Sequence, residues 1–395
     1  MRSSPKSRGR LASLAYRWRV YILQSGGRLA SLAYRWRVYV MQSGGRLASL
    51  AYRWRVYVLQ SGGRLASLAY RWRVYVLLAG IVAVMAAIAP NFATPENAAN
   101  ILKAASINLL AGIGFTIVMI SGQLDLSIGS AMTLGGMMAV GLQPQLGWAG
   151  SVAVALACGL AVGLANGLLV TKARINSFIV TLGTMIILQN IVFIYCKGGT
   201  ISANSFDLSD GLQQALVLPW IGPVSSLPRI SLVFGLMAVV AVLVRWTPVG
   251  RGFYLVGGNL QTAWYSGLAV DRYTTGAFVL SGVLSTVGGA IIAMSEANAN
   301  PTLGDNSLMT IVAAVIIGGT SMQGGKGSLV GTAVALVALA ALVNGLSCRG
   351  EGYEVQLMAG GLVLALIIVY DAWAAYRREQ KRGQRKDLLK ELRPV

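Results

Sequence analysis

The chain has 395 residues, of which 55% are hydrophobic and only 12% are charged, and its formal net charge is +20. The mean hydropathy of +0.63 and the 48 glycines are typical of a polytopic membrane protein and exclude an ordinary soluble domain. The sequence contains no histidine, which excludes Ser-His-Asp triads and histidine metal sites. An enzyme embedded in the membrane is therefore disfavoured.

The N-terminal part is a basic arm that contains four near-identical copies of an 18-residue unit within residues 9–80. The copies begin at Gly9, Gly27, Gly45 and Gly63. Each copy mixes Arg with Trp and Tyr, a composition typical of the cytoplasmic face of a membrane, where these side chains meet anionic lipid. Basic ends also occur in nucleic-acid-binding proteins, but the apolar segments that follow require a membrane, so we expect a lipid contact and no nucleic acid. We expect residues 1–71 to be a cytoplasmic arm whose first three copies are dispensable, because the fourth precedes the first membrane span.

Apolar runs beyond this arm predict about ten membrane-spanning helices, several of them near the lower length limit for a crossing. The runs cover residues 74–90, 105–121, 128–146, 149–170, 177–196, 230–246, 274–294, 307–322, 328–346 and 355–372. Ten crossings place both termini on one side, and the basic tails assign that side to the cytoplasm. The sequence therefore predicts an all-α polytopic domain over 72–372, with some short or broken helices, and a basic cytoplasmic tail over 373–395.

The connection between the second and third runs carries a carboxylate close to membrane depth, in the stretch ISGQLDLSIGS at 120–130. A carboxylate there is costly unless it caps a helix, pairs with another group or faces a wet cavity. Two interpretations follow. Gln123, Asp125 and Ser127 line a solute pathway, or Asp125 or Ser127 is the N-cap of the next helix.

Asn108 and Asn166 are amides within apolar runs. Both are candidates for the solute pathway. Asn108 could bind a polyhydroxylated solute, although hydrogen bonds between helices explain it equally well, and helix packing is the alternative for Asn166. Gly159, Gly163 and Gly167 surround Asn166 at a spacing typical of close helix packing.

The segment 247–273 is the longest connection on the predicted cytoplasmic side. Its residues 261–266 are predicted to form a short helix, bounded by Gly258 and Asn259 before it and by Gly267 after it. Such a helix fits the groove of a soluble partner, and the alternative is a helix that lies on lipid.

The glycine-rich stretch 318–328 does not match the phosphate-binding loop of nucleotide hydrolases. Thr320 stands where the first glycine of that loop belongs, and Gly327 replaces the hydroxyl residue that would hold magnesium. We therefore expect this chain to bind no nucleotide and no cofactor of its own.

Five segments carry a family resemblance. They are SGQLDLSIGS (121–130), ARINSFIVTLGT (173–184), GRGFYLVGGN (250–259), SGVLSTVGGAI (281–291) and AAVIIGGTSMQGGKGSLVGT (313–332). With these segments the chain resembles the permease subunits of bacterial ABC importers for monosaccharides, the group that takes up ribose, xylose, arabinose, galactose and autoinducer-2.

The resemblance implies a multi-pass protein of the bacterial inner membrane that is not itself an enzyme. Its implied partners are an ABC ATPase that holds ATP and magnesium, an extracytoplasmic sugar-binding protein, and a second permease copy or a paralogue. It also implies a coupling element, which maps onto Gln261, Thr262, Ala263 and Gly267, although Gln261 and Thr262 depart from the Glu-Ala that is usual there.

Two expectations about variants follow, together with one alternative function. Asp125→Ala is expected to impair uptake more than expression, and Ala263→Asp or Gly267→Asp to uncouple the permease from its ATPase. The alternative function is an ion-coupled secondary transporter. Such a transporter usually buries several ionisable groups, and this sequence offers only Asp125 as a candidate.

Overall fold

The structure is a computed structural model that describes residues 72, 74–203, 227–363, 365–366 and 369. The chain divides into two units, Met1–Arg73 and Val74–Val395, and the helices described below belong to the second. The predicted basic arm, the predicted C-terminal tail and much of the connection 197–229 lie outside the described residues.

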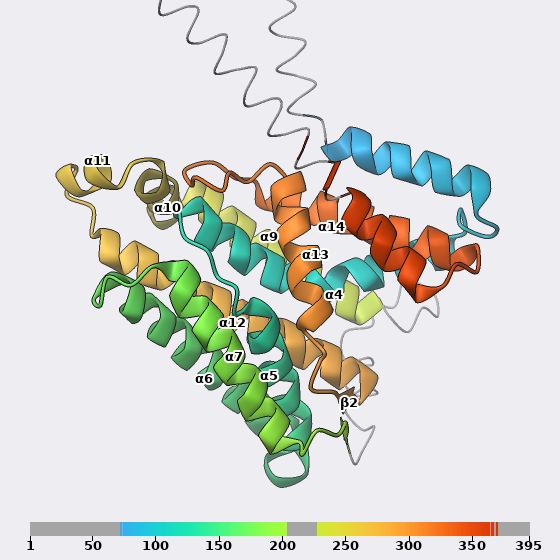
Figure 1. The fold of residues 1–395 in the computed structure, drawn as a ribbon, viewed down its shortest axis with the longest axis horizontal. Coiled ribbons are helices and arrows are strands. Elements are labelled where there is room, and N and C mark those ends of the chain that lie inside the picture. The colour runs from blue at the N-terminus through green and yellow to red at the C-terminus, as the bar shows by residue number, and fades with distance from the viewer. Residues whose placement is uncertain (1–71, 73, 204–226, 364, 367–368, 370–395) are drawn as a thin grey trace, which may run out of the picture. The chain divides into compact units, whose positions relative to one another are not determined.

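The described part is almost entirely helical, as predicted (Figure 1). An unlabelled helix, Val74–Ile88, comes first, and a helix that begins at residue 353 follows the last labelled one. The labelled elements are α4 (Pro95–Ile120), α5 (Ile128–Gly141), α6 (Gln143–Thr171), α7 (Ser177–Tyr195), β1 (Ile201–Ser202), α9 (Leu227–Trp246), α10 (Pro248–Gly258), α11 (Leu260–Tyr265), α12 (Val270–Glu296), β2 (Asn298–Ala299), α13 (Asp305–Ile317) and α14 (Leu329–Cys348). The two short strands pair antiparallel, with Ile201 opposite Ala299.

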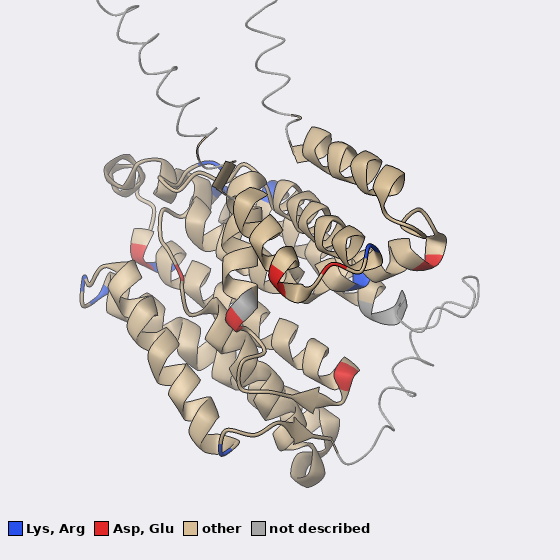
Figure 2. Cartoon of the chain, turned by 45° about the vertical axis from the view of Figure 1, so that its right-hand side comes forward, with Lys and Arg blue, Asp and Glu red and all other residues tan. Residues whose placement is uncertain are grey.

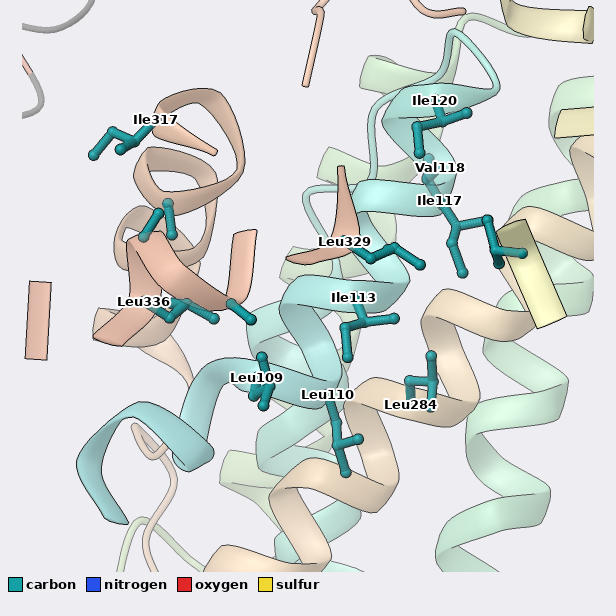
Figure 3. Packing of buried hydrophobic residues seen from close by; sticks show 14 of the residues in the cluster. Leu109, Leu110, Ile113, Ile117, Val118, Ile120, Leu284, Ile317, Leu329 and Leu336 are labelled. Carbon is teal, nitrogen blue, oxygen red and sulfur yellow. The ribbon is translucent and has the colours of Figure 1, made fainter. Parts of the chain in front are cut away.

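Helices α4 and α12 form the centre of the described unit. Helix α12 packs against α4, α5 and α6, and α4 also contacts α9, α13 and α14. Figure 3 shows the core around α4, where Leu110 and Ile113 lie on the side of Leu284 of α12, and Leu109 lies towards Leu336 of α14. Lipid is as apolar as these side chains, so close packing and hydrogen bonds must hold the helices together.

Close approach between α6 and α12 depends on glycine. A Cβ atom added at Gly159, Gly163 or Gly167 would collide with atoms of α12, and one added at Gly282 would collide with α6. This confirms the packing role expected for the three glycines of α6.

Five of the described helices are long and apolar enough to cross a membrane, namely α4, α6, α7, α12 and α14. Helix α9 and α10 give a sixth candidate if the pair, bent by 70°, is one broken span. Helix α5 has 14 residues and α13 has 13, so each extends about 20 Å, less than the hydrocarbon thickness. Short and broken helices are thus present as expected, whereas the number of ten crossings stays a prediction.

Several boundaries differ from the prediction by a few residues, and two larger differences have a clear local cause. Helix α4 begins at Pro95, ten residues before the predicted apolar run, because the Thr94 side chain accepts a hydrogen bond from the Asn97 amide and proline suits a first helical turn. The first half of the predicted connection 247–273 is helix α10, which starts after Thr247 in the same way. Polar residues and caps, which a hydropathy pattern ignores, set both starts.

Charged residues lie mostly at helix ends and in connections, while the middles of the helices carry almost none (Figure 2). This distribution is typical of helices that cross an apolar layer.

Candidate functional site

The segment 121–127 between α4 and α5 places the Asp125 carboxyl group inside the protein, with only 2% of the residue exposed. Its Oδ1 accepts hydrogen bonds from the Ser127 amide at 3.0 Å and from the Ser127 hydroxyl at 2.6 Å. Its Oδ2 accepts one from the Ser281 hydroxyl of α12 at 2.7 Å. Asp125 therefore ties its own loop to the central helix.

The same network extends to two further helices. Asn166 of α6 donates from Nδ2 to the Ser127 hydroxyl at 3.0 Å, and its Oδ1 accepts from the Thr184 hydroxyl of α7 at 2.6 Å. Ser127 and Asn166 are each about 1% exposed. Buried polar groups of this kind stabilise a membrane protein when every partner is present. We name the five residues Ser281, Asp125, Ser127, Asn166 and Thr184 the polar network.

The structure gives Asp125 a local contact at the start of α5 and a contact between elements, while its role in a solute pathway stays a prediction. Ser127 occupies the N-cap position of α5 but makes no capping bond with its side chain. Asp125 instead binds the backbone amide of Ser127, a local contact at the start of the helix, and also bonds Ser281, 156 residues away. The carboxylate thus satisfies the helix start and joins two elements at once.

Gln123 lies apart from the network and lines an open cavity of about 690 Å³. The walls come from the segment 121–127, the end of α6, the start of α7, and the first residues of α11 and α12. Asp271 of α12 lines the cavity and pairs with Lys172 at the end of α6, at 3.0 Å.

Asn108 belongs to neither group. It is half-buried in α4, and its Oδ1 is buried without a hydrogen-bond partner in the described part of the chain. Its role in a solute pathway stays a prediction.

The predicted coupling helix is present as α11, one residue longer at its start and one shorter at its end than expected. The Asn259 side chain caps it by accepting a hydrogen bond from the Thr262 amide at 2.9 Å, and Gly267 ends the segment with φ of +79°. Gln261 and Thr262 are exposed. Ala263, by contrast, is only 3% exposed.

Because Ala263 is buried, the surface that α11 exposes comes from its other residues. Trp264 and Tyr265 are 66% and 80% exposed, and their rings contact each other edge to face. Since the Ala263 side chain faces its own chain, an aspartate there would perturb the fold as well as any docking. The two aromatic rings are the exposed surface of the helix.

Glycines join α10 to the end of α4 and to the loop 318–328. The Gly325 amide donates to the Ile120 carbonyl at 2.8 Å, and a Cβ atom at Gly257 would overlap the same carbonyl oxygen. A Cβ atom at Gly325 would collide with Gly258. We call this backbone contact the glycine junction. It continues directly into the segment that holds Asp125.

Several of these residues had no distinguishing signal in the sequence. Ser281 and Thr184 are hydroxyl residues in apolar helices, and nothing separates them from neighbours such as Ser285. Within the described residues, no three His, Cys, Asp or Glu side chains gather closely enough to hold a metal ion.

Comparison with known proteins places this chain in a family. Residues 97–370 match the family described as "Branched-chain amino acid transport system / permease component". The ribose import permease protein RbsC of Escherichia coli is 31% identical over 295 residues, which cover 74% of this chain and 90% of that protein.

Two further relatives agree. The ribose import permease protein RbsC of Bacillus subtilis is 34% identical over 74% of this chain and 89% of its own length. The L-arabinose ABC transporter permease protein AraH of Azospirillum brasilense is 30% identical over 77% and 87%. No solved structure matches. The family match, which spans most of the membrane helices and both candidate sites, shows that this chain belongs to the permease components of that transport family.

Proposed function

We propose that this chain is the membrane-spanning permease subunit of an ATP-binding-cassette importer for a monosaccharide or a similar small polyhydroxylated solute. The observation that carries the proposal is the identity of 30% to 34% with ribose and arabinose permeases over about nine-tenths of their length. The family description names branched-chain amino acids instead, so the solute is the first point to test.

The proposed assembly contains two permeases, either two copies or this chain and a paralogue, with an ABC ATPase and an extracytoplasmic sugar-binding protein. ATP and magnesium belong to the ATPase, and this chain hydrolyses no nucleotide. The permease is a multi-pass protein of the bacterial inner membrane with both termini in the cytoplasm. Labelling of a cysteine at residue 380 from outside intact cells would contradict this orientation.

In this proposal α11 contacts the ATPase through Trp264 and Tyr265, which are exposed aromatic residues of the kind that dominate binding energy at interfaces. Closure of the ATPase on ATP moves α11 and α10. The glycine junction passes that movement to the end of α4, and from there to the segment that contains Gln123, Asp125 and Ser127. The permease thus changes between outward and inward access through energy supplied by its partner.

The experiment is uptake of labelled ribose, xylose, arabinose and leucine in cells that lack their own importers for these solutes. The chain is expressed alone, and together with the ATPase and binding protein encoded beside it. We expect uptake of one of the sugars that requires all partners and an intact nucleotide site on the ATPase. Uptake by the chain alone, driven by an ion gradient, would indicate the secondary transporter, and uptake of leucine only would reject the sugar.

A further inference from the structure

We infer that the cavity of about 690 Å³ beside α11 is a release site for a neutral polyhydroxylated solute, which enters it after crossing the permease and before reaching the cytoplasm. The polar side chains of this site that we expect to contact the solute are those of Gln123, Arg174, Asn176 and Asp271. The inference rests on the proposed function, and it adds a binding site, its residues and its place in the transport cycle.

The polar groups that line the cavity retain hydrogen-bonding capacity. The amide of Gln123 and the guanidinium group of Arg174 have no side-chain partner within the described residues. Asn176 uses its Oδ1 to accept from the Phe178 amide, which leaves its two Nδ2 hydrogens, and Asp271 bonds Lys172 through one carboxylate oxygen only. Every sugar hydroxyl both donates and accepts, and this set offers donors and acceptors together.

The charges favour a neutral solute over an anion. Arg174 carries a positive charge, but an anion beside it would also meet the Asp271 carboxylate in the same cavity. Inorganic phosphate is therefore the appropriate negative control, because the site should not protect against thiol modification when phosphate is added.

The apolar part of the wall and the size of the cavity fit a weak, transient site. Phe178, Leu260 and Met322 supply apolar surface and are themselves 48% to 63% exposed. The volume falls within the range of about 300–1,000 Å³ usual for small-molecule sites. A monosaccharide fills it only together with water, so the solute stays hydrated and leaves readily.

Two walls of the cavity belong to the proposed coupling machinery. Leu260 is the first residue of α11, and Gly122, which lines the cavity, lies against Gly324 at the glycine junction. Movement of α11 therefore changes the shape of the site directly. Release of the solute therefore depends on the position of α11.

The test measures protection of a cysteine in the reconstituted complex with its ATPase and binding protein. Cys158, Cys196 and Cys348, which are free thiols, are first replaced by serine. Ile175→Cys places a reactive thiol in the cavity wall, and Leu255→Cys places a matched one on an exposed position of α10 outside it. The rate of modification by a membrane-impermeant thiol reagent is measured from the cytoplasmic side while the transported sugar, identified in the uptake experiment, is titrated.

We expect the sugar to slow modification at Ile175→Cys about tenfold at roughly ten times its Kd, and to leave Leu255→Cys unchanged. Gln123→Ala or Arg174→Gln in the Ile175→Cys background should raise the concentration needed for half protection about fivefold to tenfold, because each removes a hydrogen-bonding group. Arg272→Gln is the matched control, an exposed arginine outside the cavity wall that should change nothing.

Four results would overturn the inference while leaving the proposed function intact. The first three, which concern protection of the thiol, are absence of protection in a complex that transports the sugar, equal protection at Leu255→Cys, and protection by inorganic phosphate in place of the sugar. Protection that persists unchanged in both Gln123→Ala and Arg174→Gln would also overturn it. A complex that takes up none of the tested sugars rejects the proposed function, and the inference with it.

Discussion

The contribution of the polar network to stability can be tested with a matched pair of serines in α12. Ser281 and Ser285 lie one helical turn apart, and both are 0% exposed. The Ser281 hydroxyl donates to Asp125, whereas the Ser285 hydroxyl has no hydrogen-bond partner in the described part of the protein. Replacement of either serine by alanine removes the same single oxygen atom, so the two variants differ only in the hydrogen bond.

The expected magnitudes follow from these contacts. Ser281→Ala removes a buried hydrogen bond and leaves Asp125 Oδ2 without its donor, which should lower the free energy of unfolding by about 1–3 kcal/mol. Ser285→Ala removes a buried hydroxyl that is already unpaired, and should be neutral or stabilise by up to about 1 kcal/mol. We therefore expect the two variants to differ by about 2 kcal/mol.

Variants of Asp125 distinguish a structural role of its hydrogen bonds from a role of its charge in transport. Asp125→Ala removes the acceptor of three hydrogen bonds and should cost about 3 kcal/mol, taking about 1 kcal/mol for each donor because the two hydroxyls can turn towards other acceptors. Uptake per folded complex should also fall, since the loop that Asp125 holds carries Gln123 into the cavity wall. Asp125→Asn keeps the shape and should preserve most of the stability and uptake, because its amide oxygen still accepts from Ser127.

The assay is unfolding of the purified permease in detergent, followed by tryptophan fluorescence, with uptake measured on the same preparations. The reasoning is refuted if Ser281→Ala and Ser285→Ala agree within about 0.5 kcal/mol, which is the usual scatter for variants that change no specific contact. Complete loss of uptake in a fully stable Asp125→Asn would contradict a structural role and indicate that the charge takes part in transport.

Three further predictions concern the coupling path and the arm. Deletion of residues 9–62 should leave membrane insertion and uptake unchanged, and loss of uptake at normal expression would show that the repeats are needed. Gly257→Ala should lower the free energy of unfolding by about 1–3 kcal/mol and reduce uptake, because the added Cβ atom overlaps a backbone carbonyl of α4. Gly276→Ala should be tolerated, because a Cβ atom there has no other atom within 4 Å. Trp264→Ala should weaken co-purification of the ATPase about thirtyfold, by about 2 kcal/mol, whereas Trp246→Ala, at a similarly exposed position at the end of α9, should not. Equal effects of both variants would refute a docking role for α11.

Sequence patterns predicted the features that depend on neighbouring residues. The apolar runs gave the helical membrane class, and the predicted end of the second run at residue 121 lies one residue from the end of α4. The glycines and Asn259 around residues 261–266 predicted α11, because capping and chain reversal depend on local backbone geometry. The family segments correctly predicted a permease component of a transport system.

The sequence alone left the site incomplete because the decisive contacts join distant helices. The sequence indicates that Asp125 is a costly carboxylate, but its partner Ser281 lies 156 residues away in a helix with several similar hydroxyls. The sequence leaves two roles open for Asn166, and only the packing of α6 brings it to Ser127 and Thr184.

The apolar surface of membrane helices explains why the sequence predicts the helices but not the contacts between them. A helix that is apolar on all sides carries no hydrophobic stripe to mark its inward face, so hydropathy locates the helix without orienting it. Residue type alone therefore does not show that the Ser281 hydroxyl faces a carboxylate and the Ser285 hydroxyl does not. It also does not show that Ala263 faces its own chain while Trp264 is exposed. Those orientations come from the way α4, α6, α7 and α12 pack around one another, where glycines set how closely the backbones approach and each polar side chain finds its partner across the interface.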